Sequence, residues 1–426
     1  MYRKTIILIF MFLLAKQTYA QLSIEACYEK ARANYPLVRQ YGLIEQAREY
    51  NLSNVAKVWL PQIQMSAKAS YQSDVTKIPI DFSQIPIPQL AEMKIPELSR
   101  DQYGATVDVS QTLWDGGMTE AKRQMIKTNA DVDKADLEVN LYAVKERVNQ
   151  LFFGILMCDA MLEQNLLFQD ELQRNVKQIT ALEQSGLANQ ADIDAVKVEQ
   201  LKAKQNFTQV SHSRKSYLQM LAAFIGEKLD DNTSLQKPFA ASAHSTDISR
   251  PELSFFDSKL GSLDASLKEI KAGLMPKFGL FLTGGYGNPG LNMLKDGFSA
   301  YYIGGIRLSW NIGSFYTSKN RQNLINSSRN AIAVQRETFL FNTSLNQSNK
   351  ENEIDKYREM LKSDDEIITL RNAVKRSLEA KVANGTANVT DLMREVTAEA
   401  LAKHDKVLHE IEMLQATYHL KYILNN

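Results

Sequence analysis

The chain has 426 residues, and its 50 basic and 49 acidic side chains give a formal net charge of +1. A nucleic-acid partner would require a basic surface, and this balance of charge gives no support for one. The length suits either two or three ordinary domains or one very extended fold.

The first twenty residues have the composition of a secretory signal. Arg3 and Lys4 precede an apolar stretch from Ile6 to Ala15, and the small residue Ala20 ends a cleavage site. We therefore expect residues 1–20 to be a signal peptide that is removed. No later apolar run approaches the ~18 residues of a membrane-spanning helix, so no further helix of that kind is expected.

A helix from Pro36 to Val58 is expected to precede two segments with strand-like alternation. Apolar and polar side chains alternate from Pro61 to Gln72, and the same period of two returns from Tyr103 to Ser110. Each segment has about ten residues, the length that a tilted strand needs to cross a bilayer. The stretch between them is rich in proline and is expected to be a surface loop. Its prolines are Pro79, Pro86, Pro88 and Pro96.

A very long helix is expected next, because the sequence from Thr119 to Ser185 has no proline and a single glycine. Such a helix would be about 100 Å long and is rare in globular domains. Its thinly spaced apolar residues favour packing on narrow seams with one face in water. A shorter helix from Ala191 to Ile225 follows.

This order of elements is expected twice. Pro36 and Pro61 are 25 residues apart, as are Pro251 and Pro276. The two copies would be residues 21–230 and 251–426, joined by a small, polar linker at 231–250 in which a short strand or helix is the alternative. The second copy is expected to contain a helix at 251–274, strands at 278–286 and 302–310, a long helix at 318–383 and a shorter helix at 390–423.

Both long helices end in the pattern Gly-x-x-Asn-x-x-Asp. The glycine would end the long helix, the asparagine would cap the next one, and the aspartate would accept from its unpaired amides. This capping role is sufficient to explain the pattern, and a functional role is compatible with it. The residues are Gly186, Asn189 and Asp192 in the first copy and Gly385, Asn388 and Asp391 in the second.

Signals of catalysis, cofactor binding or metal binding are weak throughout. The run from Gly284 to Gly287 lacks the Lys-Ser/Thr of a phosphate loop and is better interpreted as a hairpin turn. His404, His409 and His419 do not have the i, i+4 spacing of metal ligands on one helical face. We therefore expect no enzyme, no cofactor and no metal site. The two cysteines, Cys27 and Cys158, are expected to be free unless the fold brings them together.

Four strands with one apolar face cannot close a barrel alone. Alternation by itself favours a soluble sheet, but the signal peptide and the long helices favour a membrane barrel. Open sheet edges in lipid leave unpaired backbone groups, and single-chain barrels have about eight strands or more. Three copies would supply twelve strands. The alternatives are a periplasmic coiled-coil scaffold without a pore and a surface enzyme on a barrel anchor, for which no segment is large enough.

These features together resemble the TolC family of outer-membrane efflux proteins over essentially the whole mature chain. The resemblance is carried by Asn34-Tyr35-Pro36, Trp59-Leu60-Pro61, the turn from Leu113 to Gly117 and the two glycine-to-aspartate tips. It implies an α plus β membrane protein: a homotrimer with a twelve-stranded barrel in outer-membrane lipid, continued into the periplasm by a long α-helical barrel. Such proteins are passive conduits that work with a periplasmic adaptor and an inner-membrane pump of the RND or ABC type, exporting small molecules or proteins.

The resemblance also assigns roles to the tips. Asp192, Asp194 and Asp391 would line the closed periplasmic aperture, and the tip turns with Gly186, Asn189, Gly385 and Asn388 would contact the adaptor. This sequence departs from the best-known members, because Val382 and Ala387 replace the tyrosine and arginine that help latch the second tip. Arg394 replaces the second acidic residue of the aperture.

Overall fold

The structure is a computed structural model that describes residues 21–76, 98–239 and 247–425. The expected signal peptide, the four prolines of the expected loop and the middle of the expected linker lie outside the described residues. The chain divides into two compact units. The helical unit comprises residues 1–41, 135–255 and 335–426, and the sheet unit comprises residues 42–134 and 256–334.

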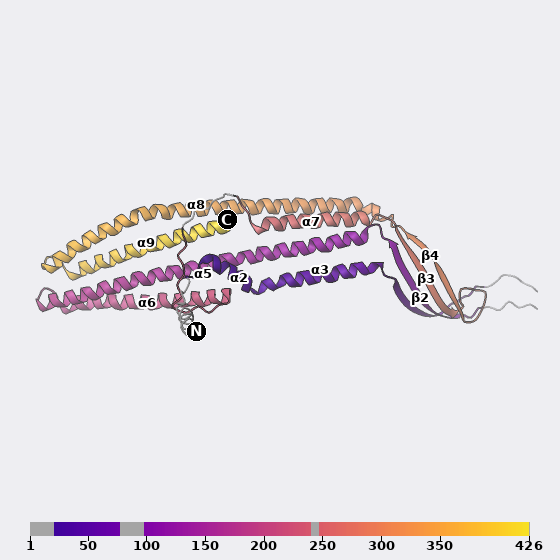
Figure 1. Ribbon diagram of the computed structural model, residues 1–426, viewed down its shortest axis with the longest axis horizontal. Coiled ribbons are helices and arrows are strands. Elements are labelled where there is room, and N and C mark those ends of the chain that lie inside the picture. Colours follow the sequence, from indigo (N-terminus) through magenta and orange to yellow (C-terminus); the bar gives the residue numbers. More distant parts are fainter. Residues whose placement is uncertain (1–20, 77–97, 240–246, 426) are drawn as a thin grey trace, which may run out of the picture. The chain divides into compact units, whose positions relative to one another are not determined.

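The order of one helix, two strands, a long helix and a shorter helix occurs twice along the described chain (Figure 1). The first series is α3 (Gln40–Ala56), β1 (Gln62–Tyr71), β2 (Asp101–Trp114), α5 (Met118–Gln184) and α6 (Gln190–Ile225). The second is α7 (Pro251–Ala272), β3 (Lys277–Asn288), β4 (Ser299–Ser309), α8 (Ser314–Ala383) and α9 (Val389–Leu424). Both long helices are confirmed, and α5 and α8 have 67 and 70 residues.

Two features before the first strand differ from the expectation. A further helix, α2 (Ile24–Asn34), begins after Ser23, whose hydroxyl accepts from the amide of Ala26 at 3.2 Å. The expected helix from Pro36 is split, because short 3₁₀ turns precede and follow α3. Tyr35 is extended, as a residue before proline tends to be, so α2 and α3 remain separate helices.

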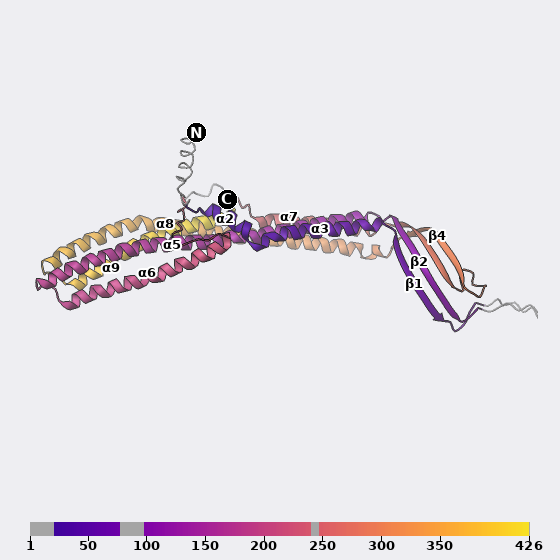
Figure 2. The same cartoon turned by 60° about the horizontal axis from the view of Figure 1, so that its bottom comes forward.

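The four strands form one antiparallel sheet in the order β1-β2-β3-β4 (Figure 2). The register opposes Met65 to Val107, Val109 to Leu282 and Leu280 to Ile306, so apolar residues of all four strands share one face. Apart from the half-buried Val109, these side chains are exposed, and Met65 is 78% exposed. The opposite face carries the polar positions Gln64, Ser66, Lys68, Thr106, Asp108, Thr283 and Arg307.

The glycine-rich run in β3 differs from its predicted structure. Gly284 to Gly287 lie inside the strand and pair with β2 and β4, so their interpretation as a hairpin turn is wrong. Glycine is needed here for space. A Cβ at Gly285 would lie 2.3 Å from the ring of Tyr301, and one at Gly287 would lie 2.6 Å from the carbonyl oxygen of Tyr103.

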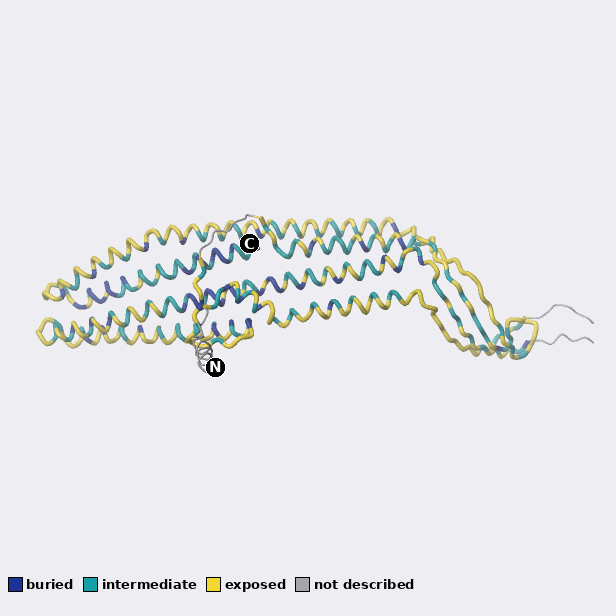
Figure 3. Tube along the Cα trace, viewed as in Figure 1, coloured by how far each residue is buried: buried dark blue, intermediate teal, exposed yellow. Residues whose placement is uncertain are grey.

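The buried residues of the helical unit form two clusters, which appear dark blue on the helices in Figure 3. The first joins α2, α5, α6 and α9 around Phe152 and Phe153, which are at most 1% exposed. Cys27 is buried in this cluster, Cys158 is also buried, and both are free thiols, which confirms the prediction for both. Burial raises the pKa of the Cys27 thiol to about 12, so this thiol is protonated and unreactive at neutral pH.

Among the described helices, α5 contains a stretch that is long and apolar enough to cross a membrane by length and composition. The expectation that the mature chain holds no such stretch is therefore wrong at this helix. A third of the stretch is buried within the chain. Val148, Phe152 and Ile155 of α5 are completely buried in the first cluster, so packing accounts for their apolar character.

Candidate functional site

The first tip turn joins α5 to α6 by a standard glycine-terminated helix end. Gly186 has a φ of +74°, in the left-handed region that favours glycine. Its amide donates to the carbonyl of Glu183 at 2.9 Å, and the amide of Leu187 donates to Leu182 at 2.9 Å. This pair of hydrogen bonds is a Schellman motif, and it satisfies the last carbonyls of α5.

The second tip turn, between α8 and α9, repeats this geometry. Gly385 has a φ of +69°, its amide donates to Val382 at 3.0 Å, and the amide of Thr386 donates to Lys381 at 2.9 Å. The two turns also meet each other. A Cβ built on Gly385 would lie 3.4 Å from the side chain of Leu187 in the first turn.

The asparagines cap the helices that follow, as the sequence predicts. Asn189 accepts from the amide of Asp192 at 3.2 Å, and Asp192 accepts from the amide of Asn189 at 3.0 Å, which completes a capping box. Asn388 accepts from the amide of Asp391 at 2.8 Å. The capping role of both asparagines is confirmed.

Each of the three predicted aperture carboxylates already has a partner within its own chain. Asp192 is engaged in the capping box, and Asp391 lies 3.4 Å from the guanidinium of Arg394. Asp194 accepts from Gln190 at 2.9 Å, and the ammonium of Lys197 is 3.9 Å away. All three stand in the first two turns of their helices, next to the tip turns. Of the three carboxylates, that of Asp192 accepts from a backbone amide, whereas those of Asp194 and Asp391 are engaged by side chains.

Behind the two turns lies the second buried cluster, which includes residues of α5, α6, α8 and α9. Val382 is 2% exposed in this cluster, and Ala387 packs against it. The residues that replace the family's latch are therefore apolar packing residues here. Their partners are Leu172, Ile179, Ile193, Val196, Ala203, Val389, Leu392, Met393 and Val396.

A buried network of charges joins the two helical hairpins. Lys375 of α8 contacts Glu171 of α5 at 2.6 Å and also forms an ion pair with Glu399 of α9. Glu399 accepts further hydrogen bonds from Lys403 at 2.7 Å and Asn372 at 2.9 Å, and its side chain is 1% exposed. This network was not predicted from the sequence. Only the i, i+4 spacing of Glu399 and Lys403 gives a local signal for it.

The network controls the ionisation of Glu399. Burial alone would raise the pKa of this carboxyl, but the hydrogen bonds from Lys375, Lys403 and Asn372 outweigh burial and lower the pKa from 4.5 to about 2. A lowered folded-state pKa means that the carboxylate stabilises the fold fully above pH ~4.5, and that this contribution is lost as the pH falls towards 2.

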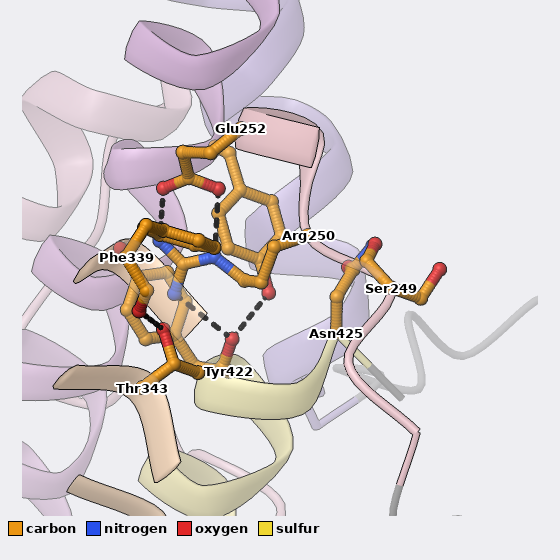
Figure 4. Close-up of polar contacts among 8 residues, drawn as sticks. Ser249, Arg250, Glu252, Phe339, Thr343, Tyr422 and Asn425 are labelled. Atoms are coloured by element: carbon orange, nitrogen blue, oxygen red, sulfur yellow. Dashed lines mark hydrogen bonds and ion pairs between the residues drawn. The ribbon is translucent and has the colours of Figure 1, made fainter. Parts of the chain in front are cut away.

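A second polar cluster anchors the start of the second copy (Figure 4). The guanidinium of Arg250 lies 4.8 Å from the ring centres of both Tyr142 and Tyr422 and pairs with the carboxylate of Glu252. Asn425 donates to the carbonyl of Ser249 at 2.6 Å. These contacts tie the end of the segment between the copies to the C-terminal end of α9.

Within the described ranges, no group of three or more His, Cys, Asp or Glu side chains is arranged to hold a metal ion. His409 contacts the buried carboxylate of Asp364 at 2.8 Å and is itself only 13% exposed. This histidine is therefore a half-buried packing residue. Its partner lies 45 positions away in the sequence, so this contact joins α9 to α8.

Residues 27–227 match the family model described as outer membrane efflux protein. No curated protein matches the chain. Several solved structures share its fold. The outer-membrane channel OprN is 14% identical with a TM-score of 0.69, and 94% of this chain and 89% of that chain are covered.

Two further solved structures have similar scores. The CmeC outer membrane channel of Campylobacter jejuni is 13% identical with a TM-score of 0.64, covering 94% of this chain and 85% of that chain. The open state of the MtrE outer membrane channel of Neisseria gonorrhoeae is 12% identical with a TM-score of 0.66, covering 95% and 89%. At these identities the likeness concerns the fold.

Replacement of Lys375 by Met tests the buried network. The change leaves Glu171 and Glu399 without their shared cation, so we expect a loss of about 3 kcal/mol of stability. The midpoint of thermal unfolding, followed by circular dichroism at pH 7, should fall clearly. Because the Glu399 contribution disappears in acid, the gap between wild type and variant should narrow below pH ~4.

The matched control is Lys202→Met, which removes an exposed lysine paired with Glu199. An exposed pair contributes about 0–1 kcal/mol, so its midpoint should stay near that of the wild type. Equal midpoints for the two variants would contradict a stabilising role of the network.

Proposed function

We propose that this chain is an efflux channel of the outer membrane and that three copies assemble into one passive duct, because residues 27–227 match the outer membrane efflux protein model and the fold is that of solved outer-membrane channels. The argument for three copies begins with the sheet edges. In the described sheet, β1 and β4 each have a single neighbour. The outer backbone groups of both strands would cost several kcal/mol each if they were left unpaired in lipid.

Pairing β4 of one copy with β1 of the next removes every edge. Three copies then close a barrel of twelve strands, a number within the range of outer-membrane barrels. The apolar sheet face turns towards lipid and the polar face towards the pore. The exposure of Ile63, Met65, Tyr302 and Ile306, each 69% or more, supports this orientation, since water would leave these side chains unburied.

The long helices are proposed to form the wall of a periplasmic tunnel that continues the barrel. The support is a row of apolar side chains that this chain leaves exposed on α8. Phe341 and Leu345 are 63% and 54% exposed, and Ile367, Leu370 and Val374 are 45–59% exposed. Spacings of three and four are those of a seam between packed helices, so a neighbouring copy is the proposed cover.

The partners of this duct are proposed to be a periplasmic adaptor and an inner-membrane pump of the RND or ABC type. The adaptor would contact the tip turns, where Gly186, Asn189, Gly385 and Asn388 are all exposed. The exported solutes would be small molecules or proteins. The pump supplies the energy, because the duct itself performs no chemistry.

Two properties of the chain itself also remain proposals. Residues 1–20 would direct it to the periplasm and be removed. The repeated order of elements would reflect a tandem duplication, with copies at 21–230 and 251–426. Residues 231–239 and 247–250 are the described parts of the proposed linker. Leu235 in this linker forms an isolated parallel bridge with Leu22 of the first copy.

The trimeric duct is tested by native mass spectrometry of the full mature chain in detergent and by current recordings in planar bilayers. We expect three copies per particle and a conducting pore, because the edge strands must pair. A monomer that is stable in water without detergent would support the alternative, a periplasmic coiled-coil scaffold without a pore.

The aperture at the tunnel tip is proposed to be lined by Asp192, Asp194 and Asp391, with six tips meeting in the trimer. Two unit charges 10 Å apart repel by roughly 1.7 kcal/mol at an effective dielectric of about 20, so a ring of carboxylates favours cations. Arg394 beside Asp391 and Lys197 beside Asp194 reduce this charge in each copy.

Neutralising the three aspartates to Asn tests this aperture while keeping side chains that can still cap the helices. We expect the cation preference of the reconstituted pore, measured as the zero-current potential in a salt gradient, to fall. The control Asp131→Asn removes one carboxylate from α5, far along the sequence from the tip, and is compared with each single aspartate replacement as well as with the triple variant. An unchanged potential in the triple variant would remove the aperture assignment.

The adaptor contact is tested by Gly186→Val against Gly186→Asn. A β-branched residue at a φ of +74° is strained by about 1–3 kcal/mol, whereas asparagine tolerates this region. Cross-linking of the adaptor to the channel in the cell envelope, normalised to channel level, should drop for Val and persist for Asn. Equal cross-linking of both variants would argue against the tip turn as the contact.

A further inference from the structure

One end of the polar sheet face carries three cations around a cavity of about 280 Å³. Lys277 begins β3 and pairs with Ser309, and Arg307 of β4 pairs with Gly279, so both cations stand on the polar face by register. Lys122, in the second turn of α5, completes the set of cations that line the cavity. This is the end of the sheet at which the strands join the helices.

None of these three cations forms an ion pair within the ranges 21–76, 98–239 and 247–425. The one acid that lines the cavity is Asp115, which is 6% exposed and accepts from the amides of Gly117 at 3.0 Å and Thr119 at 2.6 Å. This carboxylate caps the start of α5. The cavity therefore has two more positive than negative charges, and the cations are left without a carboxylate partner.

The only acid among the polar-face positions of the four described strands is engaged elsewhere. Asp108 accepts from the hydroxyls of Thr283 and Thr106, and it does not line the cavity. Two neutral hydroxyl donors therefore engage this carboxylate. The cations near the helices and the acid near the middle of the sheet are thus separate features of the same face.

Arg307 is held in a fixed position by an aromatic ring. Its guanidinium carbon lies 4.7 Å from the centre of the Phe281 ring, which also lines the cavity. Stacking fixes the plane of the guanidinium but uses none of its N–H donors. Its direct cross-strand neighbour Gly279 has no side chain, so the β3 side chain that contacts the guanidinium is that of Phe281, two positions along the strand. A planar fork of this kind matches the two oxygens of a carboxylate or phosphate.

Neutral donors surround the same space. The hydroxyls of Ser110, Thr112 and Ser309 also line the cavity, and each belongs to the polar face of its strand. Hydroxyl and guanidinium donors together suit an oxyanion, and the Phe281 ring offers an apolar surface beside it. The lining thus combines charge, hydrogen-bond donors and one aromatic wall.

We propose that Lys122, Lys277 and Arg307 form an anion-binding station in the pore, at which the carboxylate, phosphate or sulfate group of an exported solute docks in transit. The proposal rests on the proposed function, which turns the polar face towards the pore and repeats the station three times. Rings of Arg and Lys are a known device for anion passage through pores. Solutes with an acidic group and an apolar part fit the station best.

The experiment compares reconstituted pores of the full mature chain in planar bilayers. The test variant is Arg307→Gln with Lys277→Gln and Lys122→Gln, and the matched control is Lys68→Gln, which removes one cation from the same sheet face outside the cavity. Two readouts are used: the ratio of chloride to potassium permeability and the block of current by added pyrophosphate.

We expect the triple variant to lower the permeability ratio by about threefold or more and to abolish pyrophosphate block, since a ring of nine cations is lost. Arg307→Gln alone should weaken the block, and Arg307→Lys should preserve the permeability ratio because it keeps the charge. Lys68→Gln should retain the block. Native mass spectrometry confirms that each variant is assembled as the wild type is.

Three results would overturn the proposal. A conducting triple variant with wild-type permeability and block removes the station and leaves the proposed duct intact. Equal loss in Lys68→Gln and in the triple variant shows that the block follows the general charge of the face. A wild-type chain that forms no pore overturns the proposed function and the station together. If the triple variant fails to assemble, Arg307→Gln alone decides between these results.

Discussion

Backbone hydrogen bonding at the edges of the four-stranded sheet is the constraint on which the rest of this protein depends. β1 and β4 each have one neighbour, and one face of the sheet is apolar and exposed. Water could solvate the edges but would leave the apolar face unburied, whereas lipid would cover that face but leave the edges unpaired. The proposed assembly with identical chains would resolve both conditions at once. In that proposal, the rotation that closes the sheet would also cover the exposed apolar seams of the long helices with neighbouring chains.

The helical unit solves a different problem, because two separate hairpins must be held together without a compact core. Apolar packing behind the tip turns joins the two hairpins, and so do the ion pairs around Glu399. Burying an ion pair contributes little net stability but strongly favours one arrangement of its partners. Because Lys375 lies between Glu171 and Glu399, this network joins the first hairpin to the second. A pore that opens at its tips would have to preserve or exchange these contacts, whatever latches the aperture.

The distribution of charge distinguishes two regions that a solute would pass in such a duct. At the tips, the carboxylate of Asp192 caps α6, and that of Asp391 is paired with Arg394. In the described part of the chain, the polar sheet face carries cations without carboxylate partners at its helix-proximal end. Capping explains Asp192 without reference to transport. Lys277 and Arg307 have no such capping role, and the proposed anion-binding station rests on them.

The sequence by itself determined the elements whose signals are local. Alternation with a period of two located all four strands, the lack of proline and glycine located α5 and α8, and the glycine and asparagine spacing located both tip turns. Contacts between distant segments needed the tertiary structure. Gly285 lies inside a strand because Tyr301 needs the space, α2 is stabilised by burial against α6, and Lys375 pairs with acids from two other helices. Such partners are 16 to 204 positions apart, and no periodicity or propensity carries information about them.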